Sequence, residues 1–384
     1  MTKKICVVTG TRAEYGLLHR LLFILKNDPQ IELQLVVTGS HLSPSHGMTI
    51  NEIESDGFVP VAKLPIDLSN DSKLATVKAM ANVTSQIAET LSGLNPSVVV
   101  LLGDRYEILA TAQAALMLDI PVAHIHGGEL TSGAFDDSIR HAVTKISSLH
   151  FVAAEEYARR VVQLGEQPSS VFNVGSLGVE NALASKLMDK SDLSAALNVE
   201  LKNPILLVTY HPTTRSTMSA TEEIDQVLSA LENFSYCTIV FTGVNADPGN
   251  AEVSSQITKF VQRDTKLRSL HASLGQNKYL SLLNLCDAVI GNSSSGIIEA
   301  PAFGKPTINI GNRQDGRLRA NSIIDVGVAK QEIQTAIETA LSPNWREQCA
   351  ETVSSYKSSN TAQRIADTLK NAELNLHKTF FDIS

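Results

Sequence analysis

A run of small hydroxyl residues follows an apolar segment in the second half of the chain. The segment DAVI at 287–290 is typical of a buried strand, and GNSSSG at 291–296 comes directly before a stretch with helical spacing. Serine hydroxyls and the unpaired N–H groups of a helix N-terminus together favour an anion. We therefore predict that Ser293 and Ser294 bind a diphosphate and that Glu299 accepts hydrogen bonds from ribose hydroxyls, as acidic residues do in dinucleotide-binding folds. A serine N-cap followed by a solvent-exposed Glu299 explains the same residues equally well.

Charged residues also follow two apolar segments in the first half of the chain. Arg12 lies in GTRAEYG at 10–16, where the flanking glycines suit a turn that faces a phosphate or a sugar. Asp104 and Arg105 lie in GDRYE at 103–107, at the end of the most apolar segment. A carboxylate in that place is partly desolvated, which can adjust its pKa to proton transfer. The alternatives are a surface arginine in a turn for Arg12 and a helix cap for Asp104.

The richest group of titratable side chains lies between residues 124 and 141. It comprises His124, His126, Glu129, Asp136, Asp137, Arg140 and His141. Its composition is that of a metal site, but it holds no HExxH or comparable ligand spacing, so no metal is predicted. Acid–base groups around a sugar ring are the better interpretation, with His124 and His126 on one face of a strand. Asp137 also fits as the N-cap of the helix that follows.

Polar residues follow the apolar segments of the second half as well. His211 precedes a proline at the end of a predicted strand and is a candidate partner of a phosphate or a leaving group. A histidine that is satisfied within its loop explains it equally well. Arg313 and Arg317 flank a glycine turn and are candidates for phosphate contacts or for salt bridges across a cleft. The chain has no GxGxxG or GxxxxGK[ST] motif, so nicotinamide, flavin and ATP are not predicted and no cofactor is expected.

Short β-branched segments alternate with longer amphipathic ones along the whole chain. This alternation predicts parallel sheets covered by helices on both faces, with ligands beyond the carboxyl ends of the strands. The predicted strands lie at 4–10, 33–39, 98–104, 122–128, 150–156, 171–176, 205–211, 238–243, 267–272, 288–292 and 306–311. We predict an α/β fold of two doubly wound, Rossmann-like domains, at 1–180 and 181–384, facing a cleft. The last helix, at about 361–373, would pack back on the first domain.

The bulk properties narrow the class of protein. A chain of 384 residues predicts two domains. The net charge of −8 argues against a nucleic-acid binder, which should show an excess of Lys and Arg. The four cysteines are far apart and form no CxxC pair, which favours buried free thiols in a reducing compartment. No segment approaches the length of a membrane span, so we expect a cytoplasmic protein.

Taken together, these motifs resemble those of the UDP-N-acetylglucosamine 2-epimerases, and most closely the hydrolysing branch of bacterial sialic-acid pathways. The motifs that carry the resemblance are GTRAEYG, GDRYE, HIHGGE, FDDSIRHAVTK, GSLGVENAL, GNSSSG and INIGNRQDGR, which run over most of the chain. The resemblance implies a GT-B fold with the active site in the interdomain cleft. It places sugar and acid–base chemistry on the first domain and UDP on the second, and it implies a homodimer or homotetramer.

The resemblance also implies roles for single residues. Positions that contact the nucleotide or its phosphates are Arg12, Arg105, His211, Asn245 and Arg313, with Ser293 and Ser294 on the diphosphate and Glu299 on the ribose. Asp104 and Asp136 match acidic catalytic positions, and His211 joins the catalytic candidates. His126 stands where many relatives have a catalytic glutamate, so either His126 takes over acid–base work or Glu129 supplies the carboxylate. Leu17 stands where some relatives have a lysine.

The implied reaction is elimination followed by hydration. A proton leaves C2 of UDP-GlcNAc and UDP departs, which gives 2-acetamidoglucal. Water then adds, C2 is protonated from the opposite face, and free N-acetylmannosamine is released for sialic-acid biosynthesis. The alternatives are the same reaction on UDP-2,4-diacetamido-2,4,6-trideoxyglucose for legionaminic acid, a non-hydrolysing epimerase, a GT-B glycosyltransferase and a sugar-nucleotide sensor. The pattern DDSIRH at 136–141 favours the hydrolysing branch, the acidic residues disfavour a sensor, and the net charge gives no sign of a docking face for an acceptor.

Overall fold

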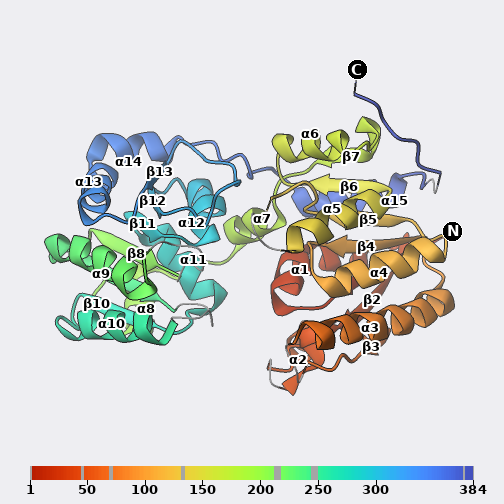
Figure 1. Ribbon diagram of the computed structural model, residues 1–384, viewed down its shortest axis with the longest axis horizontal. Coiled ribbons are helices and arrows are strands. Elements are labelled where there is room, and N and C mark those ends of the chain that lie inside the picture. Colours follow the sequence, from red (N-terminus) through yellow and green to blue (C-terminus); the bar gives the residue numbers. More distant parts are fainter. Residues whose placement is uncertain are drawn as a thin grey trace. The chain divides into compact units, whose positions relative to one another are not determined.

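The structure is a computed structural model that describes residues 2–44, 47–68, 72–130, 135–211, 218–243, 250–374 and 377–383 (Figure 1). The chain divides into two compact units. The first comprises Met1–Asn181 together with Ser358–Ser384, and the second comprises Ala182–Lys357. Each unit is a layered α/β structure around its own parallel sheet.

The first unit is built on a seven-stranded sheet in the order β3-β2-β1-β4-β5-β6-β7. All of its strand pairs are parallel. Its elements are β1 (Lys3–Thr9), α1 (Arg12–Asn27), β2 (Ile31–Thr38), η1 (Gly39–Leu42), α2 (Ile50–Ser55), β3 (Ala62–Leu64), α3 (Lys73–Leu94), β4 (Val98–Leu102), α4 (Tyr106–Met117), β5 (Val122–Ile125), α5 (Asp136–Ile146), β6 (Leu149–Val152), α6 (Glu155–Gln163), η3 (Pro168–Ser170), β7 (Val171–Asn173), α7 (Leu177–Ala184) and α15 (Thr361–Asn371).

Alternating side chains of the strands fill two cores, one on each face of this sheet. On β1, Ile5 and Val7 belong to the core that α1 and α15 cover, whereas Cys6 and Val8 belong to the core that α3 and α4 cover. A strand buried on both faces needs apolar residues at every position, which is why the central strands read as unbroken apolar runs. The sheet therefore holds the loops at the carboxyl ends of its strands on a rigid base.

The end of the chain returns to the first unit. The side chains of Ala362, Ile365 and Leu369 on α15 are buried in the core that contains α1. Beyond α15, the ammonium group of Lys378 lies 2.6 Å from Oε2 of Glu166, whose side chain is almost fully buried. Hydrophobic burial and a partly buried ion pair thus attach two parts of the C-terminal segment to the same unit.

The second unit has a six-stranded sheet in the order β10-β9-β8-β11-β12-β13, with parallel pairs throughout. Helices α9, α10 and α13 share one core with the sheet, and helices α8 and α11 share the other. Its elements are α8 (Lys190–Leu197), β8 (Ile205–Thr209), α9 (Ala220–Leu231), η4 (Glu232–Phe234), β9 (Thr238–Thr242), α10 (Asn250–Gln262), β10 (Arg268–His271), α11 (Gly275–Leu285), β11 (Ala288–Gly291), α12 (Ser294–Ile298), η5 (Ala300–Phe303), β12 (Thr307–Ile310), β13 (Ile323–Val326), α13 (Lys330–Leu341) and α14 (Pro343–Ala350).

Every predicted strand is present, and each ends one to four residues earlier than predicted. Strands β3 and β13 are not among the predicted strands. Both lie at sheet edges and are only partly buried, and each carries one exposed charged residue, Lys63 in β3 and Asp325 in β13. The final helix, predicted at about 361–373, is α15.

Candidate active site

Asp104 and Asp136 lie in one charged group beyond the sheet of the first unit. Asp104 follows β4, and its carboxylate accepts a hydrogen bond from the guanidinium of Arg140 on α5. Asp104 is not a helix cap, because the N-cap of α4 is Arg105. Asp136 opens α5, where burial and, next, the charge of Asp104 raise its pKa. A paired carboxylate beside a carboxyl that is inclined to hold a proton is the arrangement that acid–base chemistry requires.

His126 and Glu129 follow β5 and contact each other. Nδ1 of His126 lies 2.9 Å from Oε1 of Glu129. His126 has a left-handed backbone with φ of 67°, so it has left the strand. The side chains of His126 and Glu129 are 16% and 14% exposed, so the pair is partly accessible to solvent. The resemblance leaves open whether His126 or Glu129 replaces the catalytic glutamate of many relatives. The structure places these two side chains in contact.

The prediction that His124 and His126 share one face of a strand is wrong. Strand β5 ends at Ile125, so only His124 belongs to it. The ring of His124 is fully buried, with Nε2 2.8 Å from the carbonyl oxygen of Gly103 and Nδ1 3.1 Å from Oγ1 of Thr144. Burial lowers the pKa of His124 to about 3. His124 is a neutral side chain that ties β5 to the turn after β4.

The predicted N-cap role of Asp137 is also wrong. The N-cap of α5 is Phe135, which makes no side-chain cap bond. Asp137 lies in the first turn of the helix, where Oδ2 is 3.5 Å from Nε2 of His141. An i,i+4 pair of this kind adds little to stability, but it sets a second acidic side chain beside Asp136.

The two predicted arginines of the first unit have different surroundings. Arg12 is mostly exposed, and Nε donates to Oε2 of Glu52 at 3.0 Å. Arg105 is half-exposed, and Nε donates to Oε1 of Glu107 at 2.7 Å and lies 4.0 Å from Oε1 of Glu14. Both arginines remain candidates for contact with an anion.

Sequence reasoning missed the two buried carboxyl groups of Glu14 and Glu107. Each lies two positions after one of the arginines, in the patterns Arg-Ala-Glu and Arg-Tyr-Glu, and each falls in the first turn of a helix. A glutamate in a first turn is normally a solvated helix residue. The repeated spacing after two strand-end arginines is the signal that could have marked them.

Asn292 organises the strand ends of the second unit. The backbone N–H of His211 donates to its Oδ1 at 2.7 Å, and its own amide donates to the carbonyl of His211 at 2.8 Å. Nη1 of Arg313 donates to its backbone carbonyl at 3.2 Å. The buried side chain of Asn292 thus joins the ends of β8 and β11, and its backbone carbonyl binds Arg313 in the segment after β12. Asn292 is the second residue of GNSSSG, but the prediction of an anion site does not use it.

The serines of this run lie where they were predicted to lie. Ser293 is the N-cap of α12, and its hydroxyl accepts from the backbone N–H of Ser295 at 3.4 Å. Helix α12 has only five residues, so Glu299 is its C-cap rather than a residue inside a long helix. Glu299 is partly buried, not solvent-exposed; burial raises its pKa, while nearby Ser295 and Arg317 act in the opposite direction.

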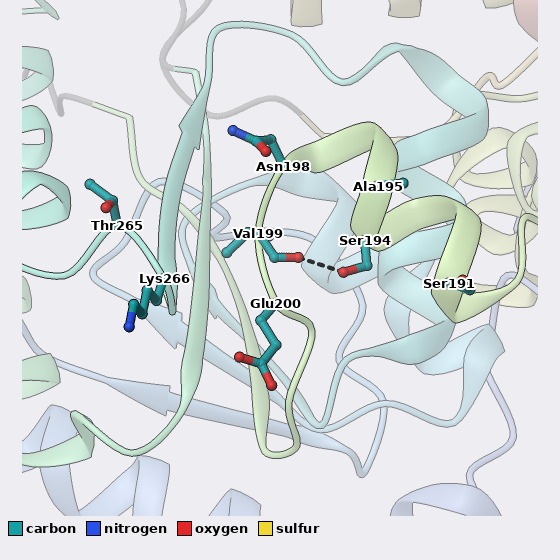
Figure 2. A pocket seen from close by; sticks show the side chains of 8 residues that line it. All are labelled: Ser191, Ser194, Ala195, Asn198, Val199, Glu200, Thr265 and Lys266. Atoms are coloured by element: carbon teal, nitrogen blue, oxygen red, sulfur yellow. Dashed lines mark hydrogen bonds between the residues drawn. The ribbon is translucent and has the colours of Figure 1, made fainter.

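Asn245 lies outside the described residues, so its predicted contact with the nucleotide stays a prediction. A groove of about 660 Å³ in the second unit is lined by Ser191, Ser194, Ala195, Asn198, Val199, Glu200, Thr265 and Lys266 (Figure 2). The Ser194 hydroxyl donates to the carbonyl of Val199 at 2.6 Å, as Figure 2 shows. The groove lies at the amino-terminal ends of β8 and β10, whereas Ser293 and Ser294 follow the carboxyl-terminal end of β11. None of the predicted site residues lines the groove.

Over the ranges that the structure describes, no group of three or more His, Cys, Asp or Glu side chains is placed to hold a metal ion. No helix in the same ranges is both long enough and apolar enough to cross a membrane.

Known proteins similar to this chain agree on one family. A sequence model of the family "UDP-N-acetylglucosamine 2-epimerase" matches residues 24–370. The chain is 41% identical to the GDP/UDP-N,N'-diacetylbacillosamine 2-epimerase (hydrolyzing) of Campylobacter jejuni, over 99% of both chains. It is 40% identical to the polysialic acid biosynthesis protein P7 of Escherichia coli, over 99% of this chain and 98% of that protein.

Solved structures agree on the fold. The UDP-GlcNAc 2-epimerase of Neisseria meningitidis, solved with UDP-GlcNAc bound, matches with a TM-score of 0.76 and 19% identity over 95% of this chain and 99% of that chain. The two parallel sheets with flanking helices are thus an α/β fold of the GT-B type. On the family match and the two whole-length relatives, the chain belongs to the UDP-N-acetylglucosamine 2-epimerase family, in its branch of hydrolysing UDP-sugar 2-epimerases.

Proposed function

We propose that the substrate is UDP-2,4-diacetamido-2,4,6-trideoxyglucose, which is UDP-N,N'-diacetylbacillosamine. The observation that carries this proposal is the 41% identity, over 99% of both chains, to a hydrolysing 2-epimerase named for that sugar. The products are then UDP and the free 2,4-diacetamido-2,4,6-trideoxymannose. The second candidate is UDP-GlcNAc, which the 40% identity to a protein named for polysialic acid biosynthesis and the description of the family both favour.

The first step is elimination. A base removes the proton from C2, the C1–O bond breaks, and its electron pair leaves with UDP, so that a C1–C2 double bond remains. We assign the base to Asp104, because the guanidinium of Arg140 holds its carboxylate in place at the end of β4. The hydroxyls of Ser293 and Ser294, with the guanidinium groups of Arg12, Arg105 and Arg313, would stabilise the departing diphosphate. Glu299 would hold the ribose, and Asn245 and His211 would complete the nucleotide contacts.

The second step is hydration of the double bond. An acid protonates C2 from the opposite face, and water adds to C1 and loses a proton. We assign the acid to Asp136, because burial and the charge of Asp104 raise its pKa and favour the protonated form. The His126–Glu129 pair is assigned to the water, since an imidazole held by a carboxylate is a suitable general base.

Three further expectations belong to this proposal. The first unit would supply the acid–base groups, and the second would bind UDP. The enzyme would act as a homodimer or homotetramer, which light scattering on the purified protein measures. It would work in the cytoplasm and without a metal or a nicotinamide, so extensive dialysis against a chelator should leave its turnover unchanged.

Proton NMR in D2O tests the function with both sugars in parallel. The expected result is a free 2-epimerised sugar with deuterium at C2 and an equal amount of UDP, with a higher kcat/KM for the diacetamido sugar. A higher kcat/KM for UDP-GlcNAc would favour the second candidate. Release of a UDP-linked epimer would contradict hydrolysis, and absence of reaction with both sugars would contradict the proposal. GDP-linked diacetamido sugar serves as a third arm, because the Campylobacter relative is named for both nucleotides.

A further inference from the structure

Two carboxyl groups are buried beneath the turns that follow β1 and β4. Glu14 comes from the first turn of α1 and is 6% exposed, and Glu107 comes from the first turn of α4 and is fully buried. The space above Glu107 is closed by glycines, since a Cβ at Gly10 would lie 2.7 Å from Oε1 of Glu107. At Gly39 a Cβ would lie 2.5 Å from the carbonyl oxygen of Gly10. The turns are thus packed directly on the two carboxyl groups.

Among the residues that the structure describes, Arg105 is the cation that faces both carboxyl groups. Nε of Arg105 donates to Oε1 of Glu107 at 2.7 Å and lies 4.0 Å from Oε1 of Glu14. The backbone N–H of Gly10 donates to Oε2 of Glu14 at 2.7 Å. Oε1 of Glu14 and Oε2 of Glu107 are buried and have no hydrogen-bond partner among the described residues. A buried polar atom without a partner costs free energy, so its presence needs an explanation.

The charges do not balance if both carboxyl groups are ionised. Burial and the charge of Glu107 raise the pKa of Glu14 to about 8. The backbone hydrogen bonds from Gly10 and Thr11 and the charge of Arg105 lower this pKa, but their effects are weaker. His41 lies in the neighbouring turn with Nε2 3.1 Å from Oγ1 of Thr9, and burial lowers its pKa to about 4, so it adds no charge at neutral pH. At pH 7 Glu14 is therefore mostly protonated, and it shares the guanidinium of Arg105 with the carboxyl group of Glu107. Asp136 lies within reach of the field of Glu107.

We propose that Glu14 and Glu107 form a proton-holding pair that positions Arg105, and that binding of a diphosphate at Arg105 is coupled to proton uptake by Glu14. The proposal rests on the proposed function, in which Arg105 contacts the diphosphate. An anion near Arg105 adds negative charge beside Glu14 and competes for the guanidinium. Both effects favour the protonated form of Glu14. Glu14 and Glu107 are positioning residues, because they act through Arg105.

Calorimetry of UDP binding measures this coupling. At pH 8, in buffers with different ionisation enthalpies, we expect uptake of about 0.5 proton per UDP, because a group with a pKa of about 8 is half ionised there. UDP affinity should fall about fourfold between pH 7 and 8.5. Glu14→Gln imitates the protonated carboxyl, so this variant should bind UDP without proton uptake and with an affinity that does not change over that range. Glu89→Gln, on the exposed side of α3, is the matched control and should behave like the wild type.

The ligand-free titration separates the possible failures. Carbon NMR of protein labelled at glutamate carboxyls should show one group that titrates near pH 8 and is missing from Glu14→Gln. If UDP binds without proton uptake, or if the variant takes up the same number of protons, the coupling is wrong while the proposed function stands. If no carboxyl titrates above pH 6, the proton-holding pair itself is wrong. If the carboxyl titrates near pH 8 but neither UDP nor GDP binds, both the coupling and the proposed function are wrong.

Discussion

Asp104 is the residue at which chemistry and binding should separate most clearly. Replacement by Asn keeps the shape of the side chain but removes the charge that faces Arg140 and the capacity to take a proton. We expect Asp104→Asn to lower kcat at least about 100-fold, in the range that general base catalysis contributes, with UDP affinity within about threefold of the wild type. Steady-state kinetics and calorimetry of UDP binding measure the two effects.

The matched control for this variant is Asp137→Asn on the same helix as Asp136. Asp137 carries the same functional group, but its carboxylate pairs with His141 on the next turn of the helix. Its replacement should lower kcat less than about threefold. Near-normal turnover of Asp104→Asn would show that the carboxylate of Asp104 is structural. Thermal unfolding of Asp104→Asn, compared with Asp137→Asn, shows whether loss of the ion pair with Arg140 destabilises the fold.

Glu299 should affect binding rather than turnover. A carboxylate that accepts hydrogen bonds from ribose contributes about 1.5–3 kcal/mol, so Glu299→Ala should weaken UDP binding about 10- to 100-fold. Saturating substrate should restore most of kcat. Glu338→Ala, on the exposed side of α13, is the control for removing a glutamate from the same unit. Equal UDP affinity of wild type and Glu299→Ala would remove this residue from the ribose site.

For single residues, the sequence predicts where a side chain lies better than it predicts the burial and protonation of that side chain. The strand-end rule places Asp104, His126, His211 and Ser293 beyond the sheets, because parallel strands end at one edge. It cannot tell where a strand ends to within one residue, which is why it places His126 on the same strand as His124 although β5 ends at Ile125. The protonation of a residue such as Glu14 depends on burial and on neighbours distant in sequence, and local patterns do not contain that information.

The C-terminal segment is held to the first unit by an ion pair between Lys378 and the buried Glu166. Glu166 accepts from Lys145, His150 and Lys378, with Oε2 2.6 Å from the ammonium of Lys378. These partners hold the pKa of Glu166 at about 2 although burial acts in the opposite direction. A carboxyl whose folded pKa lies below its unfolded value of about 4.5 stabilises the fold above pH 4.5 and loses that contribution as the pH falls towards 2.

We expect Glu166→Gln to lower the free energy of unfolding of the first unit by about 2–3 kcal/mol at pH 7. The difference from the wild type should shrink as the pH falls from 4.5 towards 2. Urea unfolding at a series of pH values, followed by circular dichroism, measures this difference. Glu155→Gln is the control, because Glu155 is exposed on α6 and pairs only loosely with Arg159, at 3.9 Å. A difference that stays constant over this pH range would show that packing, not charge, is lost.

The elements themselves were largely predictable. Strands such as β4 and β8 are buried on both faces, so their sequences are short and almost entirely apolar. Such a short apolar run is typical of a central strand in a parallel sheet. Edge strands β3 and β13 are short and half-exposed, so their sequences carry no comparable signal. The polar stretch Lys190–Leu197 lies between the predicted strands at 171–176 and 205–211 and forms α8, whose N-cap Asp189 accepts from the backbone N–H of Asp192.

On the scale of the whole molecule, the order of the chain and the order of the compact units differ. Residues Ser358–Ser384 belong with Met1–Asn181, and the backbone N–H of Ala362 donates to Oε2 of Glu180 at 2.8 Å. We therefore expect fragment 1–181 to be unstable alone, because the apolar side chains of α1 lose the cover of α15.

Joining residue 181 to residue 358 through a short Gly-Ser linker should give a fragment that unfolds cooperatively. Fragment 182–357, which contains every element of the second sheet, should do the same. Circular dichroism and thermal melts of the three fragments measure these outcomes. A fragment 1–181 as stable as the linked fragment would show that α15 contributes little. Leu369→Ala in the linked fragment removes a buried side chain of α15. Its effect on the melting temperature measures how much the packing of α15 contributes.

The return of the last segment to the first unit also has a consequence for biosynthesis. The ribosome makes α1 before the second unit and α15 after it. At synthesis rates of about 5–20 residues per second, this interval lasts on the order of ten seconds or more. During that time the second unit can complete its core, while the apolar face of α1 remains uncovered. The unit that is begun first is finished last, so the nascent chain carries an exposed apolar surface on α1 until α15 has been made.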